Sequence, residues 1–545
     1  MRGIVARFGK IFVLAGLALA VTASSGAAGS PARARILGVV PRHAGQLATA
    51  STPHALSRAI RAAGPATLTF DAKYQSAINQ FFTDVAHDSL HPTNVYSVAE
   101  QYSDGSGLIQ YRSTFGGSYV DHNPLPANGC DDATPTLHDP YCLTDQQLRN
   151  EIQAVLTAKG WHGGLDHIFF LMTPNGVGSC ETAAGNCSTD AFCAYHSDFL
   201  NSNNEDVIYA NEPYEGPDPL QGCIDPTTQG FPNDPDADTT INTISHEHNE
   251  AITDPLTDPF NAAWIAADGS ENGDLCAFGF GTPLGTSSNG QPYNQLINNH
   301  PYSLQQEWSN HDNGCIQHSG DLNPTPPTSG QGPLLYGGGP VMHTNTVYAI
   351  YWLPTARNKS APVVTGTAVI SKTLTTSAGS WDGGGAAPFS YQWQRCSSTG
   401  TSCASIPGAT ANTYKLTTAD GGHAVRSTVR ATNVNGVSPP AGSAGTKMVV
   451  DVPAATKAPH ISGRARVGKK LSGSHGTWTY SPAFAYQWLR CNASGASCTS
   501  ISHATHAKYK VTNRDAKHRL RLRVTASNAA GRVKATSAAS ARVGR

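Results

Sequence analysis

Apolar and polar residues alternate along much of the C-terminal third of the chain. Residues 425–429 read Val-Arg-Ser-Thr-Val, and residues 520–524 read Leu-Arg-Leu-Arg-Val. A period of two places the apolar side chains on one face of a strand. Gly, Pro and Asn separate these runs, as they do at turns between strands. The pattern predicts all-β structure in this part of the chain.

The same region contains a repeat with a period of 95 residues. Tyr-Gln-Trp-Gln-Arg-Cys at 391–396 returns as Tyr-Gln-Trp-Leu-Arg-Cys at 486–491. The offset holds further along, and the matched pairs are Cys403 and Cys498, Tyr414 and Tyr509, Asp420 and Asp515, Asn433 and Asn528, and Gly436 and Gly531. The repeat predicts two β-sandwich domains, at 355–450 and 451–545.

These repeats resemble the immunoglobulin-like modules of bacterial secreted proteins. The resemblance implies a core tryptophan in each Tyr-Gln-Trp motif and a spacer or ligand-binding role rather than catalysis. Six residues separate Cys396 from Cys403, and six separate Cys491 from Cys498. Because this spacing is too short to join two sheets, we expect each pair to close a local hairpin.

Further upstream, apolar residues recur at helical spacing between 238 and 255. At 100° per residue, one helix face holds Ile241, Ile244, His248, Ala251 and Ile252. The opposite face holds His246, Glu247, Glu250 and Asp254. Asp238 or Thr239 can cap the start of this helix, and Pro255 helps to end it.

The polar face carries the motif His-Glu-x-x-Glu. His246 and Glu250 are four residues apart, so one turn of helix presents both side chains to a single metal ion. Glu247 lies beside them, where it can take a proton from metal-bound water.

The motif resembles the H-E-x-x-H helix of thermolysin-like zinc peptidases, with Glu250 in place of the second histidine. In those peptidases a downstream glutamate is the third zinc ligand. The resemblance therefore implies Glu271 as third ligand here. Asp274 then either orients His246 or replaces Glu271 as the ligand.

Other interpretations of these residues stay open. The polar face could be solvated, with His246 and Glu250 as an ordinary surface pair. A calcium site is less favoured because histidine is a poor calcium ligand. We expect His248 in the core and Asp254 at the helix end. We interpret His196 as a loop histidine near a disulfide rather than as an extra ligand or transition-state donor.

Charge is divided unevenly along the chain. With 39% hydrophobic and only 14% charged residues, the composition excludes collagen-like and highly charged disordered proteins. Residues 66–318 hold 33 Asp and Glu against 4 Lys and Arg, a net charge of −29. Residues 451–545 hold 17 Lys and Arg against 2 Asp, a net charge of +15. Two surfaces with different partners are implied. The acidic part argues against nucleic acid as the main partner.

The first 34 residues read as a secretory signal peptide. A basic start precedes an apolar run at 11–23, and small residues follow up to candidate cleavage points near Ala28 or Ala34. The alternative is a retained signal anchor. No later stretch approaches the roughly 20 apolar residues of a membrane span. With export, the 12 Cys are expected to form disulfides, in a protein that is secreted, extracellular or bound to the cell surface.

Several segments of 66–318 are similar to the bacterial secreted members of the phosphate-induced protein 1 (exordium-like) family. The matching stretches are 80–84, 94–97, 101–102, 167–171, 178–180, 193–196, 207–210, 246–255, 261–264 and 271–276. Plant members are cell-wall proteins linked to growth, and they have lost the His/Glu helix motif. Membership by itself therefore implies no catalysis.

A strand-like apolar run at 336–354 follows a Pro/Gly-rich linker at 319–335, which is expected to pack against nothing. In bacterial relatives a similar run opens the domain, just before a part that resembles 69–74. We therefore expect a circular permutation in which this run returns to complete the sheet. The alternative is a truncated second copy that leads into the first sandwich.

These patterns predict a multidomain protein. A low-complexity segment at 35–65 precedes an α+β, zincin-like domain at 66–318, and two immunoglobulin-like sandwiches follow. The predicted function is a secreted zinc-dependent hydrolase, most simply a peptidase that acts on peptides or proteins. The alternative is a non-catalytic cell-surface or matrix-binding protein with a structural or vestigial metal site. In either case the basic last domain could bind an anionic cell-wall polymer.

Overall fold

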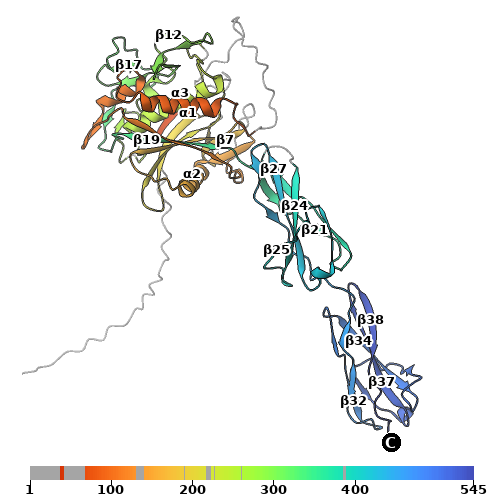
Figure 1. The fold of residues 1–545 in the computed structure, drawn as a ribbon. Coiled ribbons are helices and arrows are strands. Elements are labelled where there is room, and N and C mark those ends of the chain that lie inside the picture. Colours follow the sequence, from red (N-terminus) through yellow and green to blue (C-terminus); the bar gives the residue numbers. More distant parts are fainter. Residues whose placement is uncertain are drawn as a thin grey trace, which may run out of the picture.

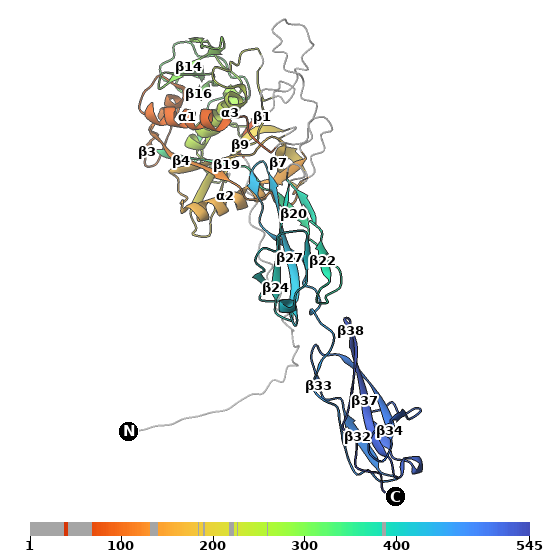
Figure 2. The same ribbon diagram turned by 45° about the vertical axis from the view of Figure 1, so that its right-hand side comes forward.

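The computed structural model describes residues 37–41, 68–130, 140–183, 185–188, 191–216, 223–225, 227–258, 260–383 and 388–545. The signal peptide predicted at 1–34 and most of the segment at 35–65 lie outside these residues. The described chain forms an N-terminal α+β domain followed by two all-β domains (Figure 1). The second view shows the same order (Figure 2).

A six-stranded mixed sheet forms the centre of the N-terminal domain. Its order is β1 (Leu37–Pro41), β9 (Phe192–Leu200), β10 (Asp206–Glu212), β6 (His167–Met172), β19 (Asn345–Trp352) and β4 (Ser113–Asp121). The last four strands run parallel, whereas β9 is antiparallel to β10 and β1 is antiparallel to β9. The sheet therefore has an antiparallel edge.

Helices cover both faces of this sheet (Figure 1). They are α1 (Tyr74–His87), α2 (Asp145–Lys159) and α3 (Pro235–Thr253). Ile168 and Phe170 of β6 pack with α1 and α3, whereas Phe169 and Leu171 pack with α2. Because both faces are covered, β6 is a continuous apolar run rather than an alternating one.

Strand β19 lies between β6 and β4 and pairs with both. This is the apolar run that was expected to join a sheet. Its C-terminal end also lies beside the start of the domain, because Asn435 Nδ2 donates to Leu68 O at 2.8 Å and to Pro354 O at 3.1 Å. Such neighbouring ends are what a circular permutation requires.

The segment 319–335 is packed onto the domain, so its interpretation as a linker with nothing to pack against was wrong. Thr325 and Cys315 exchange backbone hydrogen bonds of 2.9 and 2.8 Å, and Thr328 N donates to Leu275 O at 2.9 Å. Leu334 is buried. Composition does not reveal such backbone partners on distant elements, which is why the prediction failed.

Short elements and four disulfides complete this domain. The elements are η1 (Val95–Gln101), β2 (Ser103–Asp104), β3 (Gly107–Leu108), β5 (Tyr141–Thr144), β7 (Val177–Thr182), β8 (Gly185–Cys187), β11 (Trp264–Ile265), η3 (Asp274–Cys276), β12 (Gly285–Thr286), β13 (Pro292–Tyr293), β14 (Gln295–Ile297), β15 (His300–Tyr302), β16 (Glu307–Ser309), β17 (Gly314–Ile316) and β18 (Leu335–Tyr336). The disulfides are Cys130–Cys142, Cys180–Cys187, Cys193–Cys223 and Cys276–Cys315.

The two C-terminal domains share one strand arrangement. The first contains β20 (Arg357–Ser360), β21 (Val364–Thr365), β22 (Thr373–Thr376), β23 (Ser380–Asp382), β24 (Phe389–Cys396), β25 (Ala404–Ser405), β26 (Thr413–Lys415), η4 (Thr418–Asp420), β27 (Ala424–Asn433), β28 (Gly436–Val437) and β29 (Ala441–Gly442). The second contains β30 (Ala455–Lys457), β31 (His460–Ser462), β32 (Lys470–Ser474), β33 (Thr477–Trp478), β34 (Ala483–Cys491), β35 (Thr499–Ser500), β36 (Lys508–Lys510), η5 (Asn513–Asp515), β37 (Arg519–Asn528) and β38 (Gly531–Thr536). The order β21-β22-β26 in the first matches β31-β32-β36 in the second.

The predicted core tryptophans and local disulfides of these two domains are confirmed. Trp393 and Trp488 are fully buried. Disulfides join Cys396 to Cys403 and Cys491 to Cys498, and each closes a local hairpin, β24–β25 or β34–β35.

Asp420 organises the turn before the long strand β27. It accepts hydrogen bonds from Thr417 N (2.7 Å), Tyr414 OH (2.9 Å) and Arg395 Nη2 (2.7 Å). Because Asp420→Ala leaves these donors without an acceptor, we expect it to destabilise the domain by about 2–3 kcal/mol. Urea unfolding measures the loss. The control is Asp382→Ala, which removes a more exposed pair and should cost at most about 1 kcal/mol. Equal losses would contradict the prediction.

Candidate metal centre

Helix α3 carries the His-Glu-x-x-Glu motif. Its cap is Asp234, whose side chain accepts from Ala237 N at 3.2 Å, and Pro235 is its first residue. The predicted caps, Asp238 and Thr239, lie inside the helix instead. Proline suits a first helical position because it lacks the N–H that would be unpaired there. The helix ends at Thr253, just before Pro255, as expected.

The motif residues are buried, not solvated. His246, Glu247 and Glu250 are each 0% exposed, so the interpretation as an ordinary surface pair was wrong. Buried carboxylates are costly unless something compensates their charge.

The two other assignments on this helix are confirmed. His248 is a core residue, with Nδ1 3.2 Å from Tyr96 OH and Nε2 3.0 Å from Asn345 Oδ1. Asp254 caps the helix C-terminus, and its Oδ1 accepts from Ala263 N at 2.6 Å.

One group of potential ligands surrounds His246. Its Nε2 lies 2.9 Å from Glu250 Oε1 and 3.7 Å from Asp274 Oδ1, yet it has no hydrogen-bond partner of acceptable geometry. Ligand atoms of the three residues lie within 4.8 Å of one another. A Cβ on Gly273 would lie 3.0 Å from Glu250 Oε1 and from His246 Nδ1, so glycine permits this close approach. The three atoms converge as ligands of one ion would.

A second group surrounds His196, which lies within β9 rather than in a loop. Its Nδ1 is 3.2 Å from Glu247 Oε2 and 3.7 Å from Glu250 Oε2, and its Nε2 is 3.8 Å from Glu271 Oε1. Both carboxylate oxygens of Glu271 are buried without a partner. Glu271, the preferred third ligand in the sequence, thus groups with His196 and Glu250 rather than with His246.

The sequence did not single out three further buried residues near the centre. Glu212 accepts from Thr243 Oγ1 at 2.7 Å, and both oxygens of Glu307 lack partners. Gln305 Nε2 donates to Gly273 O at 3.0 Å and lies 2.8 Å from His246 Nδ1. Glutamate is rare in this chain, and five of its ten glutamates belong to this cluster. That rarity was the available signal.

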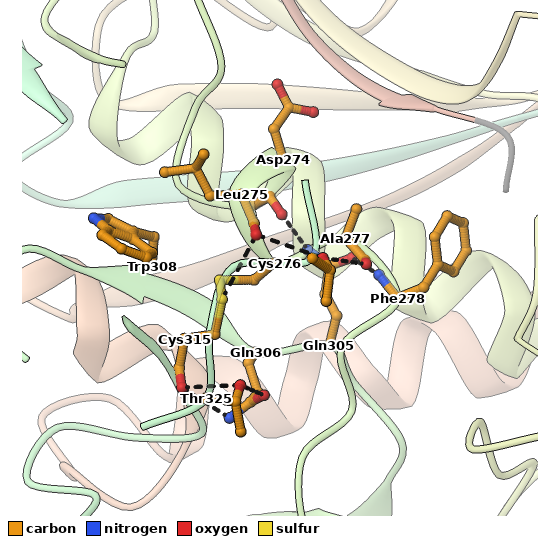
Figure 3. The surroundings of a disulfide bond; sticks show 12 residues. Asp274, Leu275, Cys276, Ala277, Phe278, Gln305, Gln306, Trp308, Cys315 and Thr325 are labelled. Atoms are coloured by element: carbon orange, nitrogen blue, oxygen red, sulfur yellow. Dashed lines mark hydrogen bonds between the residues drawn. A yellow bond between two sulfur atoms is a disulfide. The ribbon is translucent and has the colours of Figure 1, made fainter. Parts of the chain in front are cut away.

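The Cys276–Cys315 disulfide ties the segment that carries Asp274 to strand β17 (Figure 3). Gln305 lies alongside this segment in the same view. Asp274 N donates to Glu250 Oε1 at 2.9 Å, which joins the segment to α3. These links hold Asp274 close to the motif helix.

The electrostatics of the centre are dominated by buried carboxyl groups. Burial, and then the neighbouring Glu250, raise the pKa of Glu247 and of Glu271 well above the ordinary range. Burial, the largest single effect, lowers the pKa of His246, but Glu250 together with Asp274 and Glu307 outweighs it and raises the pKa to about 9. Burial lowers the pKa of His196. Among the described ion pairs, only histidines reach these carboxylates.

A separate carboxyl pair gives a pH-dependent prediction. Burial, and then Asp121, raise the pKa of Glu151 to about 8. The folded protein then keeps a proton that the unfolded chain loses, so stability falls as pH rises from 4.5 to about 8. We expect Glu151→Gln to raise the melting temperature above that of the wild type at about pH 9 but not at about pH 4. Glu181→Gln, on β7, is the control. The same difference in melting temperature between Glu151→Gln and the wild type at both pH values would contradict the prediction.

No protein-family model and no curated protein matches the chain. Among solved structures, the FN1–FN3 domains of chicken CNTN1 are 14% identical, with a TM-score of 0.19 over 34% of this chain and 65% of theirs. A Ca²⁺-stabilised adhesin with which an Antarctic bacterium binds ice is 13% identical, with a TM-score of 0.20 over 47% of this chain and 61% of its own. A titin fragment is 13% identical, with a TM-score of 0.20 over 52% of this chain and 89% of its own.

The chain thus spans less than two thirds of the first two structures. Its C-terminal part consists of all-β domains. Within the described residues, no helix is long and apolar enough to cross a membrane.

Proposed function

We propose that the N-terminal domain is a zincin-like domain that binds zinc and hydrolyses peptide bonds in extracellular substrates. The observation that carries the proposal is the convergence of His246 Nε2, Glu250 and Asp274, whose ligand atoms lie within 4.8 Å in a buried cluster with unpaired polar atoms. The packing of the motif helix against the mixed β-sheet supports the zincin-like α+β fold class. The matching segments support membership of the exordium-like family, and the six disulfides support export.

Each residue has a distinct role in this proposal. His246, Glu250 and Asp274 would hold the zinc, which would polarise a carbonyl and lower the pKa of water. Glu247 is adjacent on the same helix, and its Oε1 has no hydrogen-bond partner. It accepts a proton from the attacking water and returns it to the leaving amine.

Access to the buried centre involves strand β1. This strand lies along β9, with Leu37 opposite His196, and it also contacts α3 and η3. We propose that an extended peptide substrate takes its place at the β9 edge, where backbone groups can pair with it. Deleting 37–41 is expected to speed hydrolysis and metal loss to a chelator. Deletion of 55–59 is the control, and unchanged rates in both assays would contradict this step.

Elemental analysis of the purified full-length protein tests the metal site. We expect at least one zinc per chain and a lower content in His246→Ala. His343→Ala, which removes a histidine beside Asp104 on another part of the domain, should leave the content unchanged. Folded wild-type protein that takes up no zinc would overturn the proposal.

The second candidate function is a non-catalytic binding protein of the cell surface or extracellular matrix. The observation that favours it is the complete burial of the motif residues, which suits a structural ion. The basic domain at 451–545, with a net charge of +15, is proposed to bind an anionic cell-wall polymer under either function. The response of hydrolysis to Glu247→Gln separates the two functions.

A further inference from the structure

We propose that the centre holds two divalent cations bridged by Glu250, rather than one. The inference rests on the metal binding of the proposed function and extends it. It starts from Glu250, which belongs to both ligand groups: His246 and Asp274 on one side, His196 and Glu271 on the other.

The two oxygens of Glu250 face different histidines. Oε1 lies 2.9 Å from His246 Nε2 and accepts from Asp274 N, whereas Oε2 lies 3.7 Å from His196 Nδ1 and has no hydrogen-bond partner. A carboxylate that offers one oxygen to each of two ions acts as a bridge. In two-metal hydrolytic sites the ions lie about 3.5–4 Å apart, which one carboxylate can span.

His196 is oriented as a metal ligand. Its Nε2 lies 3.1 Å from Asp254 O, and because a carbonyl oxygen only accepts, the ring proton is on Nε2. The lone pair of Nδ1 is therefore directed towards Glu247 and Glu250. Ligating histidines usually donate their other N–H to a carbonyl or carboxylate in this way.

Unpaired atoms and charge also favour a second cation. On the His196 side, both oxygens of Glu271 and Oε2 of Glu250 are buried without hydrogen-bond partners. These atoms are separate from Nε2 of His246, which is unpaired in the other group. Six carboxyl groups meet here, those of Glu212, Glu247, Glu250, Glu271, Asp274 and Glu307. One divalent ion balances two charges, so a second ion removes much of the remaining cost of burying them.

The two positions are not equivalent. His246 Nδ1 faces the amide nitrogen of Gln305, which also donates to Gly273 O. For Nε2 of His246 to bind an ion, Nδ1 must carry the proton, so the Gln305 amide has to turn. His196 needs no such change. The position at His196 therefore binds its ion more tightly.

Zinc titration of the chelator-treated full-length protein tests the proposal. We expect two ions per chain, bound in two steps, and one ion in each of His196→Gln and His246→Gln. His343→Gln is the control and should bind two. One ion in the wild type would overturn the bridge while leaving the proposed function intact, and no ion would overturn both.

A measurement on the wild type avoids any folding defect of the variants. Protein loaded with Mn²⁺ is expected to give the electron paramagnetic resonance spectrum of an exchange-coupled pair. Two bound ions with uncoupled six-line spectra would show that Glu250 does not bridge them, and would overturn the proposal.

Discussion

Replacing Glu247 by glutamine is expected to lower peptide hydrolysis by about 10²–10⁴-fold while the zinc content stays unchanged. Glutamine has nearly the same shape, but it cannot accept a proton from water. Glu247 Oε2 lies 3.2 Å from His196 Nδ1, and its Oε1 has no partner, so one oxygen remains available for the reaction. The measurement compares the hydrolysis of a fluorogenic casein with elemental analysis of the same samples.

Glu181→Gln provides the matched control, because it makes the same chemical change outside the cluster. It should leave both activity and zinc unaltered. If Glu247→Gln keeps full hydrolysis with normal zinc, Glu247 is not the base. If the wild type binds zinc but hydrolyses none of a panel of peptides and proteins, the binding-protein function is favoured.

The sequence singled out residues that the structure brings close together, but it could not divide them between the two groups of potential ligands. Helical spacing identified His246, Glu247 and Glu250 because neighbours four residues apart share a helix face. His196 was assigned differently because its position depends on how β9 packs against α3. Glu271 was assigned differently because it lies between β11 and η3, on a segment whose path no local pattern encodes. His196 is 51 residues before Glu247, and no local pattern encodes that contact.

The two kinds of domain differed in how much of their fold could be predicted. The sandwiches were predictable because their strands are buried on one face and alternate in sequence, as β37 does. The parallel strands β6 and β10 of the N-terminal sheet are buried on both faces and show no alternation, so the strand order of this sheet could not be derived. The sequence also did not reveal which backbone groups pair. Thr325, in the segment that was predicted to be a linker, exchanges backbone hydrogen bonds with Cys315.

Deleting 345–352 is expected to unfold the N-terminal domain while both sandwiches stay folded. Strand β19 pairs with β6 on one side and with β4 on the other, so its loss leaves two ladders open. Tyr351 packs in the core beneath α1 and α3, and Trp352 packs in the core beneath α2. Thermal unfolding followed by circular dichroism should lose the transition of this domain. Trp352→Ala, a milder change, should cost about 3–5 kcal/mol.

A rearranged chain separates this explanation from a general effect of the deletion. In this chain, residues 336–354 are moved in front of Leu68. The sandwiches then follow residue 335 through a flexible linker. Because Pro354 O and Leu68 O both accept from Asn435 Nδ2, the new connection needs only a short link. If the present order arose by circular permutation, the rearranged domain should fold and bind the same amount of zinc. Failure of this chain to fold, with Trp352→Ala close to wild-type stability, would contradict both the circular permutation and the dependence of the domain on β19.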